Sequence, residues 1–251
     1  MRHLIPLWLV LAGFGGGVAG TVAGLASLVS YPALLAAGVP ALSANMTNTV
    51  ALVFSGVGSV WGSRPELTAH SAPLRRLCLV ALAGGITGAV LLLVTPARAF
   101  DLLVPWLIAA GSLGILVRRR ARAVPDELAL GRRRLVLDVA VFLIALYGGY
   151  FGAAAGVVLL AVLLLLTTES LPRSNAAKNL LLGLANAVAA VAFVIVGPVR
   201  WSDAVPLAVG FLVGGRVGPA IVRRVPAGPL RAVIACGGVG LAVHLGLAAY
   251  A

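Results

Sequence analysis

Long runs of apolar residues, separated by short polar or basic stretches, cover most of the chain. Six of these runs are close to the roughly 20 residues that a helix needs to cross a bilayer, and they predict membrane-spanning helices. They are residues 44–62, 74–95, 99–117, 176–197, 203–222 and 228–250. Two others, 4–38 and 135–168, are much longer. The pattern therefore predicts an all-α, polytopic membrane helix bundle.

The run at 4–38 is too long for one crossing. Its 35 residues would form a helix of about 52 Å at 1.5 Å per residue, against roughly 30 Å for the bilayer core. It must either protrude from the membrane or break and turn back. The string GGVAGTVAG, residues 16–24, lies in its middle, and GGYFGAAAG, residues 148–156, lies within the second long run.

Glycines in such strings have two interpretations. Small residues let membrane helices pack closely, and glycine can also interrupt a helix whose released backbone then lines a cavity. We favour breaks or hinges, because a break also solves the length problem. The candidate break and hinge residues are Gly16, Gly17, Gly20, Gly148, Gly149 and Gly152.

The two glycine strings belong to a series of matches between the two halves of the chain. GGVAGTVAG and GGYFGAAAG are 132 residues apart, SANMTN (43–48) and SNAAKN (174–179) are 131 apart, and LAGGITG (82–88) and LVGGRVG (212–218) are 130 apart. Spacings that agree this closely, in the same order, indicate a duplicated unit. We expect a first membrane repeat at 1–122, a charged linker at 123–131 and a second repeat at 132–251.

Composition and charge favour an inverted arrangement of these repeats. The chain is 61% hydrophobic and 10% charged, with a net charge of +12, which is too apolar for a soluble domain. Most arginines lie between apolar runs, where they set topology, and no basic stretch is interleaved with aromatics, so nucleic-acid binding is excluded. If each long run starts and ends on one side, fifteen basic residues share the linker side and three lie opposite. A single crossing gives twelve against six. The positive-inside rule thus predicts inverted repeats with a cytoplasmic linker.

A cluster of polar residues opens the second run of each half. A helix N-terminus offers unpaired N–H groups and partial positive charge, which suit a small anion. Lys178 is the one lysine of the chain, and an ammonium that enters an apolar helix needs a partner or a function. Capping, interhelical hydrogen bonds and snorkelling of Lys178 to the surface are the alternatives. The candidate substrate-binding residues are Ser43, Asn45, Thr47, Asn48, Ser174, Asn175, Lys178 and Asn179.

Arg216 is a further candidate for substrate binding. It stands inside GGRVG, within an apolar run, where it either lines the anion path or pairs with an acid such as Glu169 or Asp138. Glu169 and Asp203 are candidates for coupling to protons, although their places near the ends of runs favour surface positions.

No enzyme signature occurs in the chain. It lacks HExxH, GxSxG and GxxxxGK[ST], so we predict no catalytic residue. Cys78 and Cys236 lie in apolar runs without a CxxC motif or a nearby histidine, which indicates packing and predicts neither a metal nor a cofactor. A non-transporting membrane scaffold or assembly factor, which would have a solid interior, remains the alternative to a transporter. A transporter of another small organic anion is the other alternative.

The motifs resemble those of a known family. GFGGGVAG at 13–20, PALSANMTN at 40–48 and their echoes at 147–156 and 174–179 are similar to the TauE/SafE-type sulfite exporters. The resemblance implies a bacterial plasma-membrane protein with two homologous halves, which exports sulfite, sulfoacetate or a related sulfonate. We expect a small anionic substrate and membrane lipid as partners, with a proton or another coupling ion and a homodimer as further possibilities. We expect alternating access by movement of one repeat against the other.

Overall fold

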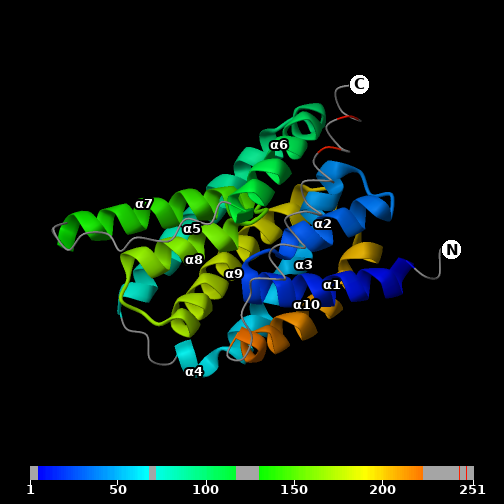
Figure 1. The fold of residues 1–251 in the computed structure, drawn as a ribbon. Helices are drawn as coiled ribbons and strands as arrows, with labels where there is room; N and C mark the ends of the chain where they lie inside the picture. The colour runs from blue at the N-terminus through cyan, green and yellow to red at the C-terminus, as the bar shows by residue number, and fades with distance from the viewer. Residues whose placement is uncertain (1–4, 68–71, 117–129, 223–242, 244–246, 248–251) are drawn as a thin grey trace.

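The computed structural model describes residues 5–67, 72–116 and 130–222, together with 243 and 247. All regular structure in these residues is helical, which confirms the predicted all-α class (Figure 1). The ten helices are α1 (Ile5–Ala23), α2 (Ala26–Ala36), α3 (Ala41–Gly62), α4 (Arg64–Leu67), α5 (Ala72–Val94), α6 (Ala97–Leu116), α7 (Leu130–Tyr150), α8 (Ala155–Leu166), α9 (Leu171–Val196) and α10 (Trp201–Val222). The predicted run 228–250 lies almost wholly outside the described residues.

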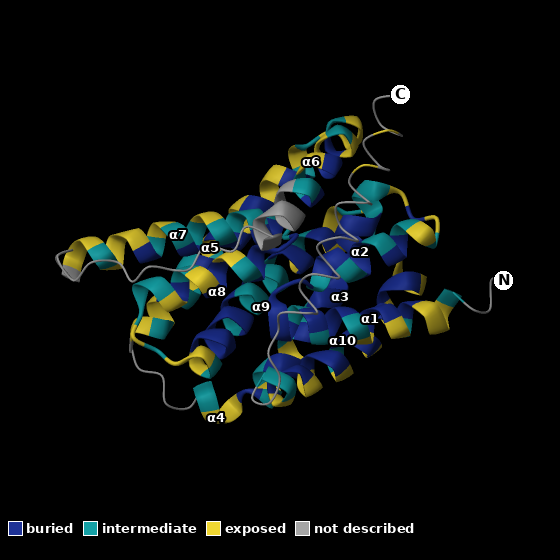
Figure 2. Ribbon diagram, viewed as in Figure 1, coloured by how far each residue is buried: buried dark blue, intermediate teal, exposed yellow. Residues whose placement is uncertain are grey.

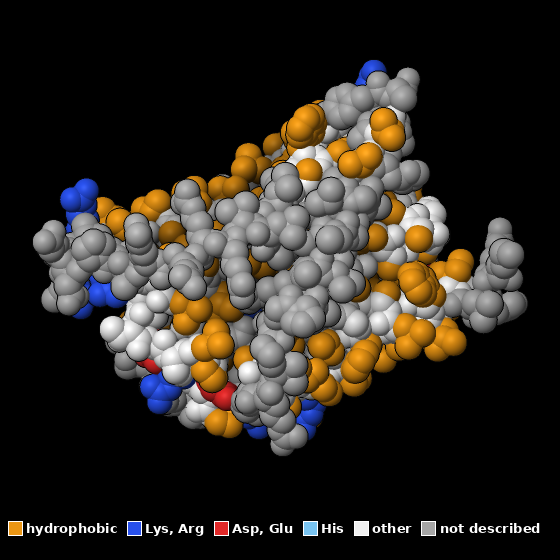
Figure 3. Space-filling view, in the orientation of Figure 1, with side chains coloured by type: hydrophobic (Ala, Val, Ile, Leu, Met, Phe, Trp, Pro, Cys, Tyr) orange, Lys and Arg blue, Asp and Glu red, His pale blue; other side chains and the backbone are white. Residues whose placement is uncertain are grey.

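Several helices are built to face lipid. By length and composition, α1, α5, α9 and α10 are each long and apolar enough to cross a membrane, and α2 and α8 are shorter apolar helices. Large apolar side chains such as Leu79, Val94 and Ile195 are exposed. Hydrophobic side chains cover much of the described surface seen in Figure 3. Apolar surface of this extent is stable in hydrocarbon and not in water. The chain is a multi-pass membrane protein.

Each of the two overlong runs is two helices with a break between them. The first break lies at Gly24, where φ is +76°, between α1 and α2. The second spans 151–154, between α7 and α8, where Gly152 has φ +74° and Ala154 has φ 59°. Glycine adopts such angles without strain, so Gly24 and Gly152 fit the turns that they make.

The other glycines of the two strings lie inside helices. Gly16, Gly17 and Gly20 belong to α1, and Gly148 and Gly149 to the last turn of α7. The first break thus falls at Gly24, beyond all three residues predicted for it. A Cβ on Gly17 would lie 2.8 Å from the Gly215 nitrogen, and one on Gly149 would lie 2.5 Å from the Gly85 oxygen. Because these two residues lack a side chain, α1 packs closely on α10 and α7 packs closely on α5. Gly17 and Gly149 therefore act in helix packing.

The helices pack around a central pair. α3 contacts α9 in the middle; α10 packs on α1 and α3, and α5 packs on α7 and α9. In Figure 1, α1 begins at the right and α7 at the left, and both end near the middle. Buried residues are concentrated where α1, α2, α3 and α9 come together (Figure 2). The two breaks meet there, because a Cβ on Gly156 would lie 2.5 Å from the Gly24 Cα.

Candidate functional site at the meeting point of the two helix breaks

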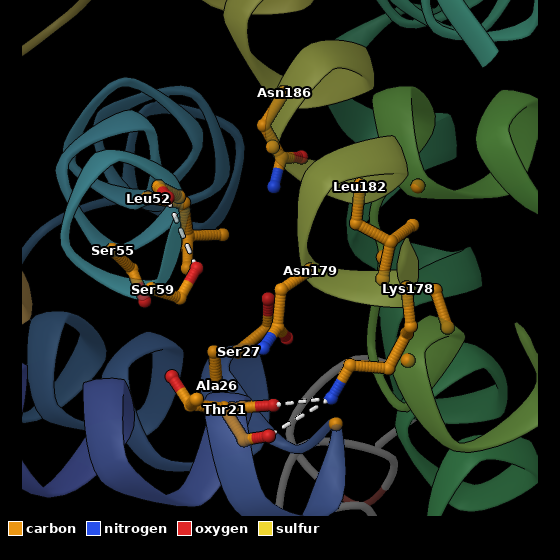
Figure 4. A pocket seen from close by; sticks show the side chains of 18 residues that line it. Thr21, Ala26, Ser27, Leu52, Ser55, Ser59, Lys178, Asn179, Leu182 and Asn186 are labelled. Carbon is orange, nitrogen blue, oxygen red and sulfur yellow. Dashed lines mark hydrogen bonds between the residues drawn. The ribbon is translucent and has the colours of Figure 1, made fainter. Parts of the chain in front are cut away.

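A cavity of about 70 Å³ lies where the two breaks meet. Its walls come from α1, α2, α3, α7, α8 and α9, so both halves of the chain contribute to it (Figure 4). Glycines form much of the surface, and this brings backbone atoms to the cavity. The polar side chains that line it are Thr21, Ser27, Ser55, Ser59, Lys178, Asn179 and Asn186. Among the described lining residues, Lys178 is the one that carries a charge.

The Lys178 side chain is buried, with 1% of its surface exposed. Its Nζ donates hydrogen bonds to the carbonyl oxygens of Gly20 and Thr21, both at 3.1 Å (Figure 4). In a continuous helix the Thr21 carbonyl would accept from the N–H of Leu25, but that N–H donates to Ala19 at 3.3 Å. The break at Gly24 therefore releases a carbonyl at the negative end of α1, and Lys178 binds it. This position, inside the bundle, differs from the snorkelling alternative.

Asn179 places an amide beside this ammonium. The side chain is 8% exposed, it lines the cavity, and its Nδ2 has no hydrogen-bond partner among the residues that the structure describes. A buried donor without a partner costs roughly 1–3 kcal/mol, so a ligand that accepts from Nδ2 would recover that energy. In Figure 4 the Asn179 side chain extends from α9 toward Ser27.

Two helix N-termini also reach the cavity. Ala26 and Ser27 open α2, and Ala155 and Gly156 open α8, and all four line the cavity wall. The first N–H groups of a helix lack intrahelical acceptors and carry partial positive charge. The helix N-termini at the cavity are therefore those of α2 and α8, which follow the breaks. The sequence instead predicts the N-termini of the next helices, α3 and α9.

The break between α7 and α8 is held by a neutral side chain. Asn45 of α3 donates through Nδ2 to the Tyr150 carbonyl, at 2.8 Å, and Tyr150 is the last residue of α7. The Tyr147 hydroxyl donates to the Ala153 carbonyl within the break, at 2.9 Å. Each half therefore caps the broken helix of the other half, with Asn45 in one direction and Lys178 in the other.

Most of the predicted polar residues pack between helices outside the cavity. The Asn48 Oδ1 accepts from Ser30 at 2.6 Å, and its Nδ2 donates to Ser27 at 3.3 Å. The Thr47 hydroxyl oxygen accepts from the backbone N–H of Arg200, at 3.0 Å. Ser43, Asn175 and Ser174 also stand outside the lining; Ser43 is half-buried and the other two are buried. Of the eight residues in the two clusters, Lys178 and Asn179 line the cavity.

Arg216 also lies away from the cavity. Its guanidinium stacks over the Trp61 ring, 3.8 Å from the ring centroid, and the residue is exposed. The acids proposed as its partners pair elsewhere: Glu169 with Arg173 at 3.4 Å, and Asp138 with Arg76 at 3.1 Å. Asp203 pairs with Arg200 at 3.0 Å.

Five polar residues that line the cavity were not predicted from the sequence. They are Thr21, Ser27, Ser55, Ser59 and Asn186, and all five lie outside the two polar clusters at 43–48 and 174–179. An asparagine within a membrane-spanning run, such as Asn186 in α9, is itself a signal, because a buried amide in lipid needs partners. Single serines and threonines carry no such signal, since they bond their own helix backbone.

Comparisons with known proteins agree with this picture. The family model described as sulfite exporter TauE/SafE matches residues 9–245. The chain is 23% identical to the probable membrane transporter protein ORF9 of Sinorhizobium sp, over 97% of this chain and 92% of the relative. It is 26% identical to the probable membrane transporter protein YfcA of Escherichia coli K12, over 86% and 81%. A probable membrane transporter protein of Haemophilus influenzae is 24% identical, over 85% and 84%. No solved structure gives a significant match.

Proposed function

Because the chain belongs to the TauE/SafE sulfite exporter family, a family of membrane transporters and not of enzymes, we propose that it exports a small sulfur-containing anion. Sulfite, sulfoacetate and related sulfonates are the proposed substrates, and the bacterial plasma membrane is the proposed location. The transporter is secondary, driven by a gradient, and the substrate binds in the cavity at the two breaks.

The buried ammonium of Lys178 is the observation that carries this proposal. A charge enclosed in a membrane protein is costly, and an oxyanion beside it would form charge-assisted hydrogen bonds. The Asn179 amide and the N-termini of α2 and α8 add further donors. A scaffold protein has no need for such a cavity, so its presence favours transport over the scaffold alternative.

The size of the cavity favours a small substrate. A single water needs roughly 10–15 Å³ of such a space, so about 70 Å³ admits a ligand with a few non-hydrogen atoms. A sulfite ion, with one sulfur and three oxygens, is of this size. A larger sulfonate would need the helices around the cavity to move apart.

Symmetry of the contacts supports a mechanism in which one repeat moves against the other. Gly17 faces Gly215, and Gly149 faces Gly85. Gly17 corresponds to Gly149 at a spacing of 132, and Gly85 corresponds to Gly215 at a spacing of 130, so the two contacts are equivalent in the two halves. Gly24 and Gly156, which also correspond, face each other at the centre. We therefore propose inverted repeats that meet at this point, with access to the cavity switched by their rocking.

Flux of labelled sulfite or sulfoacetate from proteoliposomes tests the function. Wild-type protein should transport, and Lys178→Gln should lower the initial rate at subsaturating substrate about tenfold or more, the equivalent of roughly 1.4 kcal/mol of lost binding. Arg132→Gln removes one exposed arginine and serves as the matched control with wild-type flux. Absence of sulfite and sulfonate flux in the wild type would refute the proposed substrates, and normal flux in Lys178→Gln would refute the site.

Cysteine labelling tests the inverted topology. In a background without Cys78 and Cys236, we expect a membrane-impermeant thiol reagent applied to whole cells to label Arg2→Cys and not Asp126→Cys. Lysis should then expose Asp126→Cys. Labelling of both positions from the outside would show that the two repeats are not inverted.

A further inference from the structure

A second pocket, of about 360 Å³, lies between α5, α7, α8 and α9. We name it the basic pocket, after the two arginines at its polar end. It shares no lining residue with the central cavity, and the transport proposal does not use it. Arginine side chains gather at the end of the molecule where α7 begins (Figure 3).

The polar end of the basic pocket is formed by Arg133 and Arg134 of α7, with Thr167 and Thr168 opposite. Arg133 is fixed across the mouth, because its Nε donates to the carbonyl of Leu166 at 3.1 Å. A guanidinium carries five N–H donors, so this bond leaves donors for a phosphate. The carboxylate of Glu169 also lines the pocket, and its ion pair with Arg173 offsets its charge.

The rest of the basic pocket is apolar. Its walls are side chains of four helices, with leucines predominating: Pro73, Leu74, Leu77, Leu137, Leu163, Leu166 and Ala177. A fully hydrated ion gains nothing from such walls, whereas a hydrocarbon chain fills them favourably. The pocket is therefore amphipathic, lined by two arginine side chains and by several leucine side chains.

We propose that the basic pocket binds an anionic phospholipid of the membrane. The lipid phosphate lies between Arg133 and Arg134, and part of one acyl chain lies among the leucines. Basic pockets between membrane helices, on the side rich in arginine, suit anionic headgroups, and arginine is well matched to phosphate oxygens. Charge complementarity and the leucine walls select this ligand over a zwitterionic lipid or a free anion.

Binding at this pocket would reach the central cavity through α9. Ser174 and Ala177 line the basic pocket, and Lys178 and Asn179 of the same helix line the cavity. An occupied pocket packs α9 against α5 and α8. Anionic lipid is thus expected to raise both stability and transport rate, independently of which anion is carried.

Lipid binding to the full-length protein in nanodiscs tests the proposal. With phosphatidylglycerol mixed into phosphatidylcholine, wild-type protein should retain phosphatidylglycerol through delipidation and mass spectrometry, and it should melt at a higher temperature than in phosphatidylcholine alone. Arg133→Gln/Arg134→Gln should lower retention about tenfold and remove the melting shift. Arg132→Gln removes one arginine from the same helix outside the pocket, which matches the charge change of Arg134→Gln alone, and it should behave as wild type.

Further outcomes keep the test decisive. If the double variant does not fold, Arg134→Gln alone tests the same claim, because Arg134 is exposed and the bond from Arg133 to Leu166 remains. Equal retention in Arg132→Gln and in the pocket variant would overturn the proposal, as would equal retention of phosphatidylcholine. Displacement of phosphatidylglycerol by millimolar-range free sulfite would also overturn it, since the pocket would then hold the soluble anion.

Discussion

Each half of the chain has one helix break in its long apolar run, but the two breaks are built differently. The break at Gly24 is short, and the charged Lys178 binds its released Thr21 carbonyl together with the neighbouring Gly20 carbonyl. The break at 151–154 is longer, contains both Gly152 and Ala154 at positive φ, and is capped by the neutral Asn45. Of these two capping side chains, the one at the first break is charged and the one at the second break is neutral.

This difference separates two roles, the capping of backbone carbonyls and the supply of charge. The sequences of the two polar clusters do not distinguish these roles. In both breaks a side chain from the other half satisfies backbone carbonyls, which membrane proteins must do internally. An amide is sufficient for that task, as Asn45 demonstrates. The ammonium at Lys178 brings charge that capping does not require, and its position at the cavity gives that charge an anion as its proposed counterpart.

The largest stability effect is expected at the first break. Gly24→Ala places a Cβ 2.7 Å from the Gly156 Cα, at a φ of +76°. Overpacking costs roughly 1–3 kcal/mol and the left-handed conformation roughly 1–2 kcal/mol, so we expect a loss of about 2–5 kcal/mol. The melting temperature of the purified protein in detergent measures it.

Gly38→Ala is the matched control for Gly24→Ala. Gly38 has φ +79° but nothing within 4 Å of an added Cβ, so its substitution carries only the conformational cost of roughly 1–2 kcal/mol. Equal melting shifts in the two variants would show that the close approach of Gly24 and Gly156 contributes nothing to stability.

An intermediate effect is expected from the neutral cap. Asn45→Ala removes the donor to the part-buried Tyr150 carbonyl, at a cost of up to roughly 1–3 kcal/mol for the lost hydrogen bond. Flux per folded molecule should be measured for both Asn45→Ala and Lys178→Gln. We expect Lys178→Gln to lose more flux than Asn45→Ala. If Asn45→Ala reduced flux per molecule as much as Lys178→Gln, the proposed division between capping and charge would fail.

The smallest effect is expected at Ala154, where the sign is informative. The left-handed φ of 59° costs an L-residue about 1 kcal/mol or more, and Gly is free of that cost, although it makes the unfolded chain more flexible. Ala154→Gly should therefore be neutral or stabilising by up to about 1 kcal/mol. Ala153→Gly, next to it and without positive φ, should destabilise by roughly 0.5–1 kcal/mol. A melting temperature that falls equally in both would contradict strain at Ala154.

The apolar pattern predicted the helical bundle and the interruption of both long runs, because length against bilayer thickness is a strong constraint. It did not locate the first break, since Gly16, Gly17 and Gly20 are as compatible with close packing as with a turn, and packing partners such as Gly215 are distant in sequence. Lys178 and Asn179 were predicted at a shared site, and the structure places both in the cavity lining. Arg216 was not separable from them by sequence, because its contact with Trp61 depends on how α10 crosses α3.

An experimental structure determined with bound sulfite tests the central claim most directly. We expect density for the anion inside the central cavity, within hydrogen-bonding distance of the Lys178 Nζ and the Asn179 Nδ2, and its loss in Lys178→Gln. Density for sulfite elsewhere, with this cavity occupied by water alone, would contradict the proposed site.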